Sequence, residues 1–145
     1  MSDSPTGCDL CQNPGGALLW RDDRLRVVLV AEPDYPGFCR VIWNAHVKEV
    51  TDLRWDDRRH LMAVTFEVEA LLRDLLRPDK INLASLGNMT PHLHWHVIPR
   101  WRDDPHFPGP IWGARQREVP PRALPDLEVT LRDRLAASLG GGILA

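Results

Sequence analysis

The sequence lacks any segment that would place it in or across a membrane. The longest apolar run near its N-terminus, VVLVA at residues 27–31, is far shorter than the roughly 20 residues of a membrane span. Residues 1–16 are polar and rich in turn-forming residues, and they have neither the basic start nor the apolar core of a signal peptide. We therefore expect a cytoplasmic protein with no membrane partner.

The sequence also lacks an excess of charge and a large number of cysteines. The formal net charge is −2, whereas a surface that binds a polynucleotide normally carries a basic excess. We therefore expect no polynucleotide partner, although a small anionic ligand is compatible with this charge. Three cysteines are too few for a disulfide framework, so the pair Cys8 and Cys11 needs another explanation.

The chain has the size and composition of a single globular domain. Its 145 residues are 43% hydrophobic and 26% charged, which is enough to bury a core and argues against a disordered chain. No internal repeat or low-complexity linker divides it. We therefore expect one domain over residues 1–145.

Hydrophobic periodicity predicts an α+β fold built on a mostly antiparallel, five-stranded sheet. The expected strands are two within residues 17–32, joined by a turn at Asp22–Asp23, a third at 38–43, and a pair at 80–87 and 92–101. Apolar residues at helical spacing predict a long helix between the third and fourth strands, capped by Asp52 or Asp56 and ended by Pro78. A second helix is expected over 124–139, and a short strand near 111–112.

Three histidines, His92, His94 and His96, alternate with apolar residues in the last predicted strand. Side chains alternate between the faces of a strand, so these three rings share one face at intervals of about 6.6 Å. The apolar residues between them, Trp95 included, would point into the core. Two kinds of chemistry fit this pattern: the rings could ligate one metal ion, or one ring could act as a nucleophile while its neighbours handle charge and protons.

The residues around the histidines suit a phosphate. The stretch GNMTP at residues 87–91 places a glycine and a run of backbone N–H groups just before the strand, and such a turn can direct amides at an anion. Arg100 has the same parity as the histidines and would add a fixed positive charge on their face. Amide donors, an arginine and uncharged imidazoles together predict a phosphate site.

The segment HLHWHVI at residues 92–98 has the pattern His-φ-His-φ-His-φ-φ, where φ is apolar, and Pro99 and Arg100 follow it. In this motif the sequence resembles the histidine triad family of nucleotide hydrolases and transferases. Three other features fit that family: the long helix, PGFCRVIWNAH at residues 36–46, and CDLC at residues 8–11. The resemblance covers about residues 8–112, the expected core, and leaves residues 113–145 as a C-terminal loop and helix.

The resemblance implies a mechanism through a covalent nucleotidyl-histidine intermediate. His94 would attack the α-phosphorus of a nucleotide, and water would then hydrolyse the intermediate. His96 would bind the phosphate and help to protonate the leaving group, while His92 would hold the strand geometry or join a metal site. The nucleotide-binding residues expected from the resemblance are Asn82, Asn88, Met89, Thr90 and Glu32. Glu32 is the nearest candidate for binding the ribose hydroxyls, and Met89 stands where some relatives carry a serine.

A third histidine, His96, favours the hydrolase branches of the family, because related nucleotidylyltransferases carry glutamine there. The resemblance therefore implies a purine nucleotide substrate, with a dinucleoside polyphosphate first and a nucleoside phosphoramidate second. It also implies a homodimer and no cofactor required for catalysis. Two other functions stay open: a metal-dependent enzyme that uses the three histidines as ligands, and a nucleotide-binding protein with vestigial catalysis.

Some members of the family complete a metal site with two cysteines and two histidines. Cys8 and Cys11 have the spacing to hold one zinc ion, and His46 and His92 stand at the positions of the two histidines. Four such ligands would form a closed structural site that ties the N-terminal loop to the sheet. The alternatives are a surface pair of thiols or a labile disulfide. A thioredoxin-like redox motif is disfavoured because no helix pattern follows Cys11.

Overall fold

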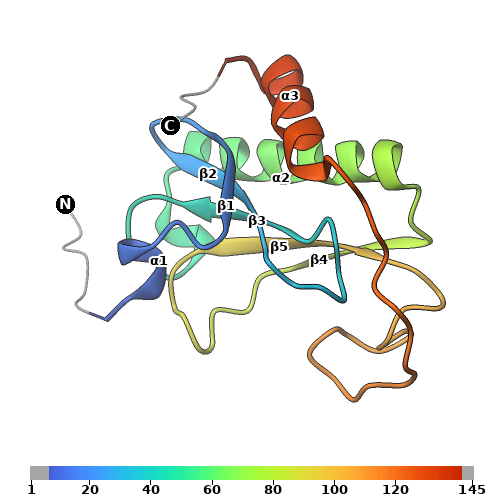
Figure 1. Cartoon of the computed structure of the whole chain (residues 1–145). Helices are drawn as coiled ribbons and strands as arrows, with labels where there is room; N and C mark the ends of the chain where they lie inside the picture. Colours follow the sequence, from blue (N-terminus) through green and yellow to red (C-terminus); the bar gives the residue numbers. More distant parts are fainter. Residues whose placement is uncertain (1–6, 142–145) are drawn as a thin grey trace.

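The computed structural model describes residues 7–141 and confirms the α+β fold (Figure 1). In chain order its elements are α1 (Asp9–Gln12), β1 (Ala17–Arg21), β2 (Leu25–Leu29), β3 (Cys39–Trp43), the 3₁₀ helix η1 (Val50–Asp52), α2 (Trp55–Leu76), β4 (Lys80–Ala84), β5 (His94–Arg100) and α3 (Leu127–Leu139). The strands form one sheet in the order β1-β2-β3-β5-β4, and every neighbouring pair is antiparallel. The long helix therefore connects the third and fourth strands, as the periodicity predicts.

A tight turn joins β1 and β2 at the expected pair of aspartates. The carboxylate of Asp22 accepts hydrogen bonds from the backbone N–H groups of Arg24, at 2.8 Å, and of Leu25, at 2.9 Å. An aspartate that bonds the backbone just beyond itself stabilises a turn in this way. The turn brings β2 back beside β1 and starts the antiparallel sheet.

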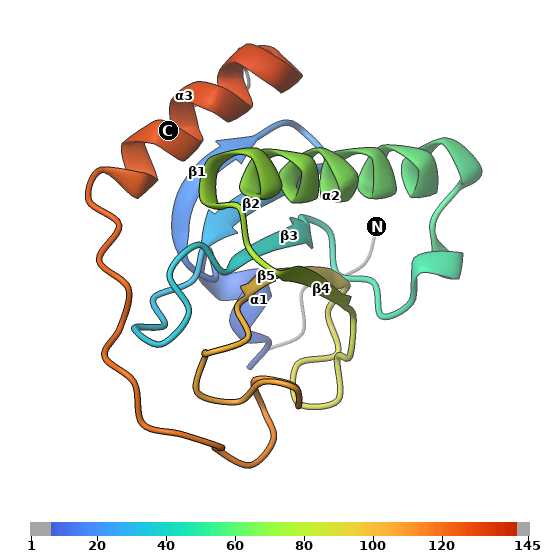
Figure 2. The same ribbon diagram turned by 90° about the vertical axis from the view of Figure 1, so that its right-hand side faces the viewer.

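The sheet has two unlike faces, because side chains alternate along each strand. One face carries apolar side chains such as Val41 and Val97, and both α2 and α3 lie against it (Figures 1 and 2). The other face carries His94, His96 and Arg40, with Arg40 directly opposite His96 in the register of β3 and β5. We call these the helix face and the histidine face.

A continuous aliphatic core closes the helix face. The buried residues of α2 recur at helical spacing and are Leu61, Val64, Thr65, Val68, Leu71 and Leu72. Leu131 and Leu135 hold α3 on the same core, and Trp95 packs against it, as expected. A fully buried aliphatic side chain contributes about 1.5–3 kcal/mol, so this face is the main source of stability.

Short segments, not long helices, cover the histidine face. At one end of it lies a small buried cluster of Cys8, Leu10, Val28 and Ile42. At the other end lies a second cluster of Tyr35, Phe38 and Ile98. His94, His96 and Arg40 lie between the two clusters along β3 and β5, and the ring of Phe38 contacts His96 and Arg40.

Two element boundaries differ from those predicted. Helix α3 begins at Leu127, not at residue 124, because the residue before Pro125 disfavours helical backbone. Strand β4 ends at Ala84 and β5 begins at His94, so the loop between them is longer than expected. Within this loop Gly87 has a φ of 73°, a left-handed conformation that favours glycine and turns the chain out of the strand.

Three shorter predictions also need correction. Asp52 lies in η1, where its side chain accepts a bond from the backbone of Glu49, and the N-cap of α2 is Arg54. Residues 111 and 112 lie in turns and form no strand. Residues 9–12 form the short helix α1, which is too short for hydrophobic periodicity to predict. No helix within residues 7–141 is both long and apolar enough to cross a bilayer.

Candidate active site and metal centre

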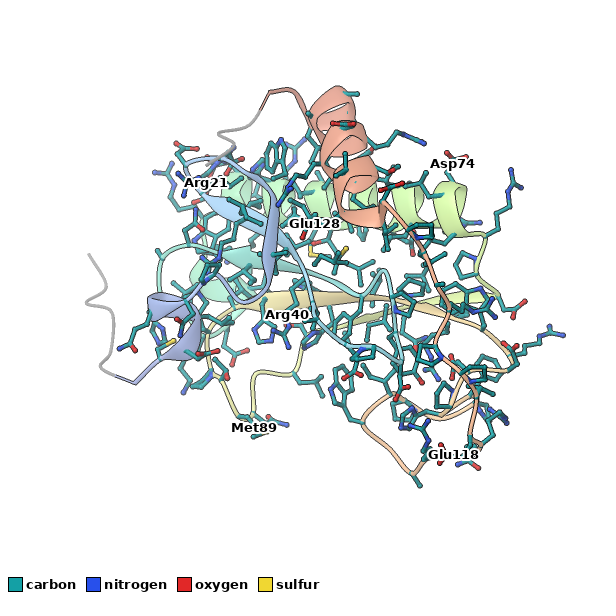
Figure 3. All side chains as sticks on the ribbon, in the orientation of Figure 1. Arg21, Arg40, Asp74, Met89, Glu118 and Glu128 are labelled. Atoms are coloured by element: carbon teal, nitrogen blue, oxygen red, sulfur yellow. The ribbon has the colours of Figure 1, made fainter. Side chains whose placement is uncertain are left out.

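A pocket of about 410 Å³ opens on the histidine face. Its walls come from β3, from β5, from the loop before β5 and from Trp112, and the lining residues are Arg40, Leu86, Gly87, Asn88, Met89, Thr90, His94, His96 and Trp112. Figure 3 places Arg40 on the side of the sheet away from α2 and α3, and Met89 at the outer end of the loop. Of the lining side chains, only that of Arg40 carries a fixed charge.

His94 is held in a single tautomer. Its Nδ1 lies 2.5 Å from the backbone carbonyl oxygen of His92. A carbonyl can only accept a hydrogen bond, so Nδ1 carries the proton and Nε2 carries the lone pair. Burial lowers the pKa of His94, which keeps the ring uncharged at neutral pH. A buried imidazole with an unprotonated Nε2 in a pocket is a competent nucleophile.

His96 lies beside His94 with its ring nearly perpendicular, at 89° and 4.8 Å between ring centroids. The rings of Phe38 and Trp112 meet it edge-on, at 5.5 and 5.0 Å, and its buried Nδ1 has no hydrogen-bond partner among the described residues. Burial, with smaller contributions from the charges of His94 and Arg40, lowers the pKa of His96 to about 3. The ring is therefore neutral at pH 7 and can donate one hydrogen bond without being a ready acid.

The positive charge in the pocket comes from Arg40, a residue that the sequence pattern does not predict for the site. Arg100 has the expected parity, but it is buried and its guanidinium donates to both carboxylate oxygens of Asp104, at 2.8 and 3.0 Å. Burial alone would raise the pKa of Asp104, yet hydrogen bonds from Arg100 and from backbone N–H groups lower it to about 2. The prediction that Arg100 serves the phosphate is therefore wrong. The available signal was an arginine inside the apolar third strand.

The five predicted nucleotide-binding residues separate into two groups. Asn88, Met89 and Thr90 line the pocket. Asn82 accepts a hydrogen bond from Arg100 at 2.7 Å, and Glu32 accepts one from the backbone N–H of Asp34 at 3.3 Å; neither lines the pocket.

A second group of side chains gathers beside α1. Ligand atoms of Cys8, Cys11, His46 and His92 all lie within 4.8 Å of one another. Nδ1 of His92 is 3.5 Å from Sγ of Cys8, 3.4 Å from Sγ of Cys11 and 3.3 Å from Nδ1 of His46. No disulfide joins the two cysteines. The four residues expected to hold a metal are thus brought together.

The geometry of this cluster fits a tetrahedral zinc ion. Bonds of about 2.3 Å to sulfur and about 2.0–2.1 Å to nitrogen require S···N edges of about 3.5 Å and N···N edges of about 3.4 Å. The sulfur–nitrogen separations of Cys8 and Cys11 from His92 and of Cys11 from His46 are 3.3 to 3.5 Å, and the two Nδ1 atoms are 3.3 Å apart. In addition, Nε2 of His92 donates to the carbonyl of Trp43 at 2.6 Å, so Nδ1 offers its lone pair to the cluster.

The three histidines of the motif therefore do not share one task. His92 precedes β5 and turns to the cysteines, while His94 and His96 line the pocket. Within residues 7–141, the one group of three or more side chains placed to hold a metal is the Cys-Cys-His-His cluster. This arrangement argues against a metal ion ligated jointly by His92, His94 and His96.

Comparison with known proteins places this site in a family. A family model described as HIT domain matches residues 13–103. The chain is 31% identical over 106 residues to a Mycobacterium tuberculosis protein named AP-4-A phosphorylase, a match that covers 69% of this chain and 54% of that protein. The chain thus spans about half the length of this curated relative.

Solved structures agree with that match. A histidine triad protein from Sinorhizobium meliloti shares 30% identity and a TM-score of 0.69, with 86% of this chain and 90% of that chain covered. A zinc-bound histidine triad family protein from Mycobacterium smegmatis shares 23% identity and a TM-score of 0.62, covering 91% and 95% of the two chains. At that identity the second likeness supports the fold alone.

Proposed function

The chain belongs to the HIT domain family, and we propose from its site that it is a nucleotidyl-transferring enzyme whose nucleophile is His94. The main support for this proposal is the hydrogen bond from Nδ1 of His94 to the carbonyl of His92, because it leaves Nε2 unprotonated. The proposed substrates carry an activated α-phosphate: a dinucleoside polyphosphate or a nucleoside phosphoramidate. The proposed cycle has two displacements at phosphorus.

In the first step Nε2 of His94 attacks the α-phosphorus. An N–P bond forms, the bond from phosphorus to the leaving group breaks, and its electron pair stays on the departing atom. A polyphosphate oxygen departs as an anion, whereas a phosphoramidate nitrogen must also take a proton, from solvent, to depart as an amine. The neutral ring of His96 supplies a hydrogen bond to the departing atom. Donors around Asn88 and Thr90, which line the pocket, bind nonbridging oxygens where negative charge grows.

In the second step an acceptor attacks the same phosphorus and releases His94. We propose water as the acceptor, which makes the enzyme a hydrolase and yields a nucleoside monophosphate. The M. tuberculosis relative is named a phosphorylase, which favours orthophosphate as a rival acceptor and would yield a nucleoside diphosphate. The two acceptors use the same covalent intermediate.

A structural zinc ion at Cys8, Cys11, His46 and His92 is part of the proposal. The separations of the four ligand atoms and the tautomer of His92 support it. When bound, the ion would cross-link the N-terminal segment to the sheet. The backbone carbonyl of His92 also accepts the hydrogen bond from Nδ1–H of His94, so fixing His92 helps to fix the nucleophile. Catalysis itself needs no cofactor in this scheme.

The partners expected from the family resemblance complete the proposal. We propose a homodimer and a preference for purine nucleotides. The molar mass of the purified protein from light scattering tests the homodimer. The ratio of kcat/KM on diadenosine tetraphosphate to that on diuridine tetraphosphate tests the purine preference. A monomeric active protein, or equal rates on the two substrates, would remove the corresponding part of the proposal.

The experiment that tests the proposed function is to trap the intermediate. The protein is mixed with diadenosine tetraphosphate, quenched, digested and examined by mass spectrometry for an adenylyl group on residue 94. Label on His94, absent in His94→Ala, is the expected result, whereas labelling elsewhere or none with either substrate class would overturn it. With orthophosphate present, AMP as product indicates water as the acceptor and ADP indicates phosphate.

A further inference from the structure

Arg40 lines the pocket and has an unused hydrogen-bond donor. Its Nε is buried and has no partner, and its one hydrogen bond among residues 7–141 runs from Nη1 to the carbonyl of Gly15 at 3.1 Å. A guanidinium has five N–H donors, so most of the hydrogen bonds that Arg40 could donate are not made within the described residues. Asp9 acts on Arg40 through charge alone, since the two form no ion pair, and the ring of Phe38 lies 5.7 Å from the guanidinium carbon.

The charge of Arg40 stands beside His96. The two residues are direct partners in the β3–β5 register, so their side chains leave the sheet on the same face. Both line the same pocket as His94. In the proposed reaction His96 faces the leaving group, which places the guanidinium at that side of the reacting phosphorus.

We propose that Arg40 binds an anionic leaving group and thereby selects dinucleoside polyphosphates over nucleoside phosphoramidates. This inference rests on the proposed function and assigns the substrate class of the same site. It makes Arg40 a catalytic residue for one leaving group and of little use for the other.

The two leaving groups make opposite demands on the site. When the phosphorus–oxygen bond of a polyphosphate breaks, the electron pair goes to the bridging oxygen and the nucleoside polyphosphate departs as an anion, which a fixed positive charge stabilises. When the phosphorus–nitrogen bond of a phosphoramidate breaks, the nitrogen must take a proton from an acid to depart as an amine. Arg40 holds its proton too tightly to supply one, and its charge repels an amine that becomes an ammonium ion.

His96 does not compensate for this in the phosphoramidate reaction. Burial, with the charges of His94 and Arg40 adding to it, lowers the pKa of His96 to about 3, so the ring is not protonated at neutral pH. The pocket therefore combines a strong fixed cation with a poor acid. That combination fits an oxygen leaving group.

Arg40 also has a structural contact, which the test must separate from binding. Its bond to Gly15 helps to hold the N-terminal segment, where Gly15 has a φ of 88° and a Cβ would lie 2.8 Å from Ile42. Arg26 holds the same segment through hydrogen bonds to the carbonyls of Leu10, Asn13 and Pro14, and it does not line the pocket. Arg26 is therefore the matched control.

The experiment measures kcat/KM on diadenosine tetraphosphate and on adenosine phosphoramidate for the zinc-loaded wild type, Arg40→Gln, Arg40→Lys and Arg26→Gln. Arg40→Gln should lose about 10²-fold or more on the tetraphosphate and less than about tenfold on the phosphoramidate, and Arg40→Lys should recover part of the difference. Arg26→Gln should leave the ratio of the two values at the wild-type level. Arg26→Lys serves as the control if Arg26→Gln does not fold.

Equal losses of Arg40→Gln on both substrates would overturn the inference and reduce Arg40 to an anchor for Gly15. A shifted ratio in Arg26→Gln would overturn it as well, because loosening the N-terminal segment would then suffice. The proposed function fails separately: if His94 takes no adenylyl group from either substrate in the wild type, both claims fall. If His94 is labelled but the ratio does not depend on Arg40, only the inference falls.

Discussion

The two faces of the sheet are built in contrasting ways. The helix face is closed by two helices whose apolar side chains form one continuous core. The histidine face is covered by short segments, each fixed by a few polar contacts such as the Arg100–Asp104 pair and the Cys-Cys-His-His cluster. The continuous core therefore lies on one face of the sheet and the pocket on the other, so a substitution within the core should leave the chemistry of the pocket largely unaffected.

The sharpest way to test this separation is to remove the nucleophile. His94→Ala should lower kcat by at least about 10⁴-fold, because the covalent route is lost. The free energy of unfolding should change less than for a core residue, since the ring lines the pocket and lies outside the continuous core of the helix face. Steady-state rates and urea unfolding of the same preparation measure both quantities. A variant with near-normal turnover would show that His94 is not the nucleophile.

The converse change removes a side chain from the helix face. Leu72 is fully buried under the sheet, and Leu72→Ala should lower the free energy of unfolding by about 2–5 kcal/mol. The kcat per folded molecule should stay near the wild-type value. Urea unfolding measures the free energy of unfolding, and active-site titration with steady-state rates measures kcat per folded molecule. A large loss of kcat in fully folded protein would break the comparison between the faces.

Removal of the metal should act on stability from the histidine face. Zinc present at about 100 times its Kd should add about 2.7 kcal/mol to the free energy of unfolding, and Cys11→Ser should abolish this gain. Cys39→Ala is the matched control, because Cys39 is fully buried in the core of the helix face and lies outside the cluster. Zinc stoichiometry by mass spectrometry should be one per chain for the control. Zinc retained by Cys11→Ser would contradict the four-ligand site.

The last expected effect is a dependence of stability on pH. The folded pKa of His96 is about 3, below its ordinary value of 6.5, so between these values the unfolded chain binds more protons. The contribution of His96 to stability should therefore be complete above about pH 6.5 and be lost progressively as the pH falls toward 3. His96→Gln should unfold with a shallower pH dependence between pH 4 and 6. Identical slopes in the two proteins would show that His96 titrates normally when folded.

Local patterns are sufficient to predict the architecture. Alternation along residues 94–100 predicts β5, and the helical spacing of Leu61 through Leu72 predicts α2, because each element repeats its environment with a fixed period. The cysteine pair and the two distant histidines also meet as the family resemblance implies. These features depend on periodicity or on a known motif.

Features that depend on which distant partner a polar group finds could not be predicted. Arg100 and Arg40 both point to the histidine face, yet only the fold shows that Asp104 neutralises the first and leaves the second available. Likewise, the side-chain oxygen of Asn82 accepts a hydrogen bond from Arg100 and so does not serve the pocket. Sequence spacing sets the face of a side chain but not its partner.

The central claim is that His94 is neutral and protonated on Nδ1, with Nε2 free to attack phosphorus. The most direct measurement is the pair of ¹⁵N chemical shifts of the His94 ring at pH 7, assigned by comparison with His94→Ala. We expect the Nδ1–H tautomer, with the chemical shift of Nε2 typical of an unprotonated nitrogen. A ring protonated on Nε2, alone or together with Nδ1, would contradict it.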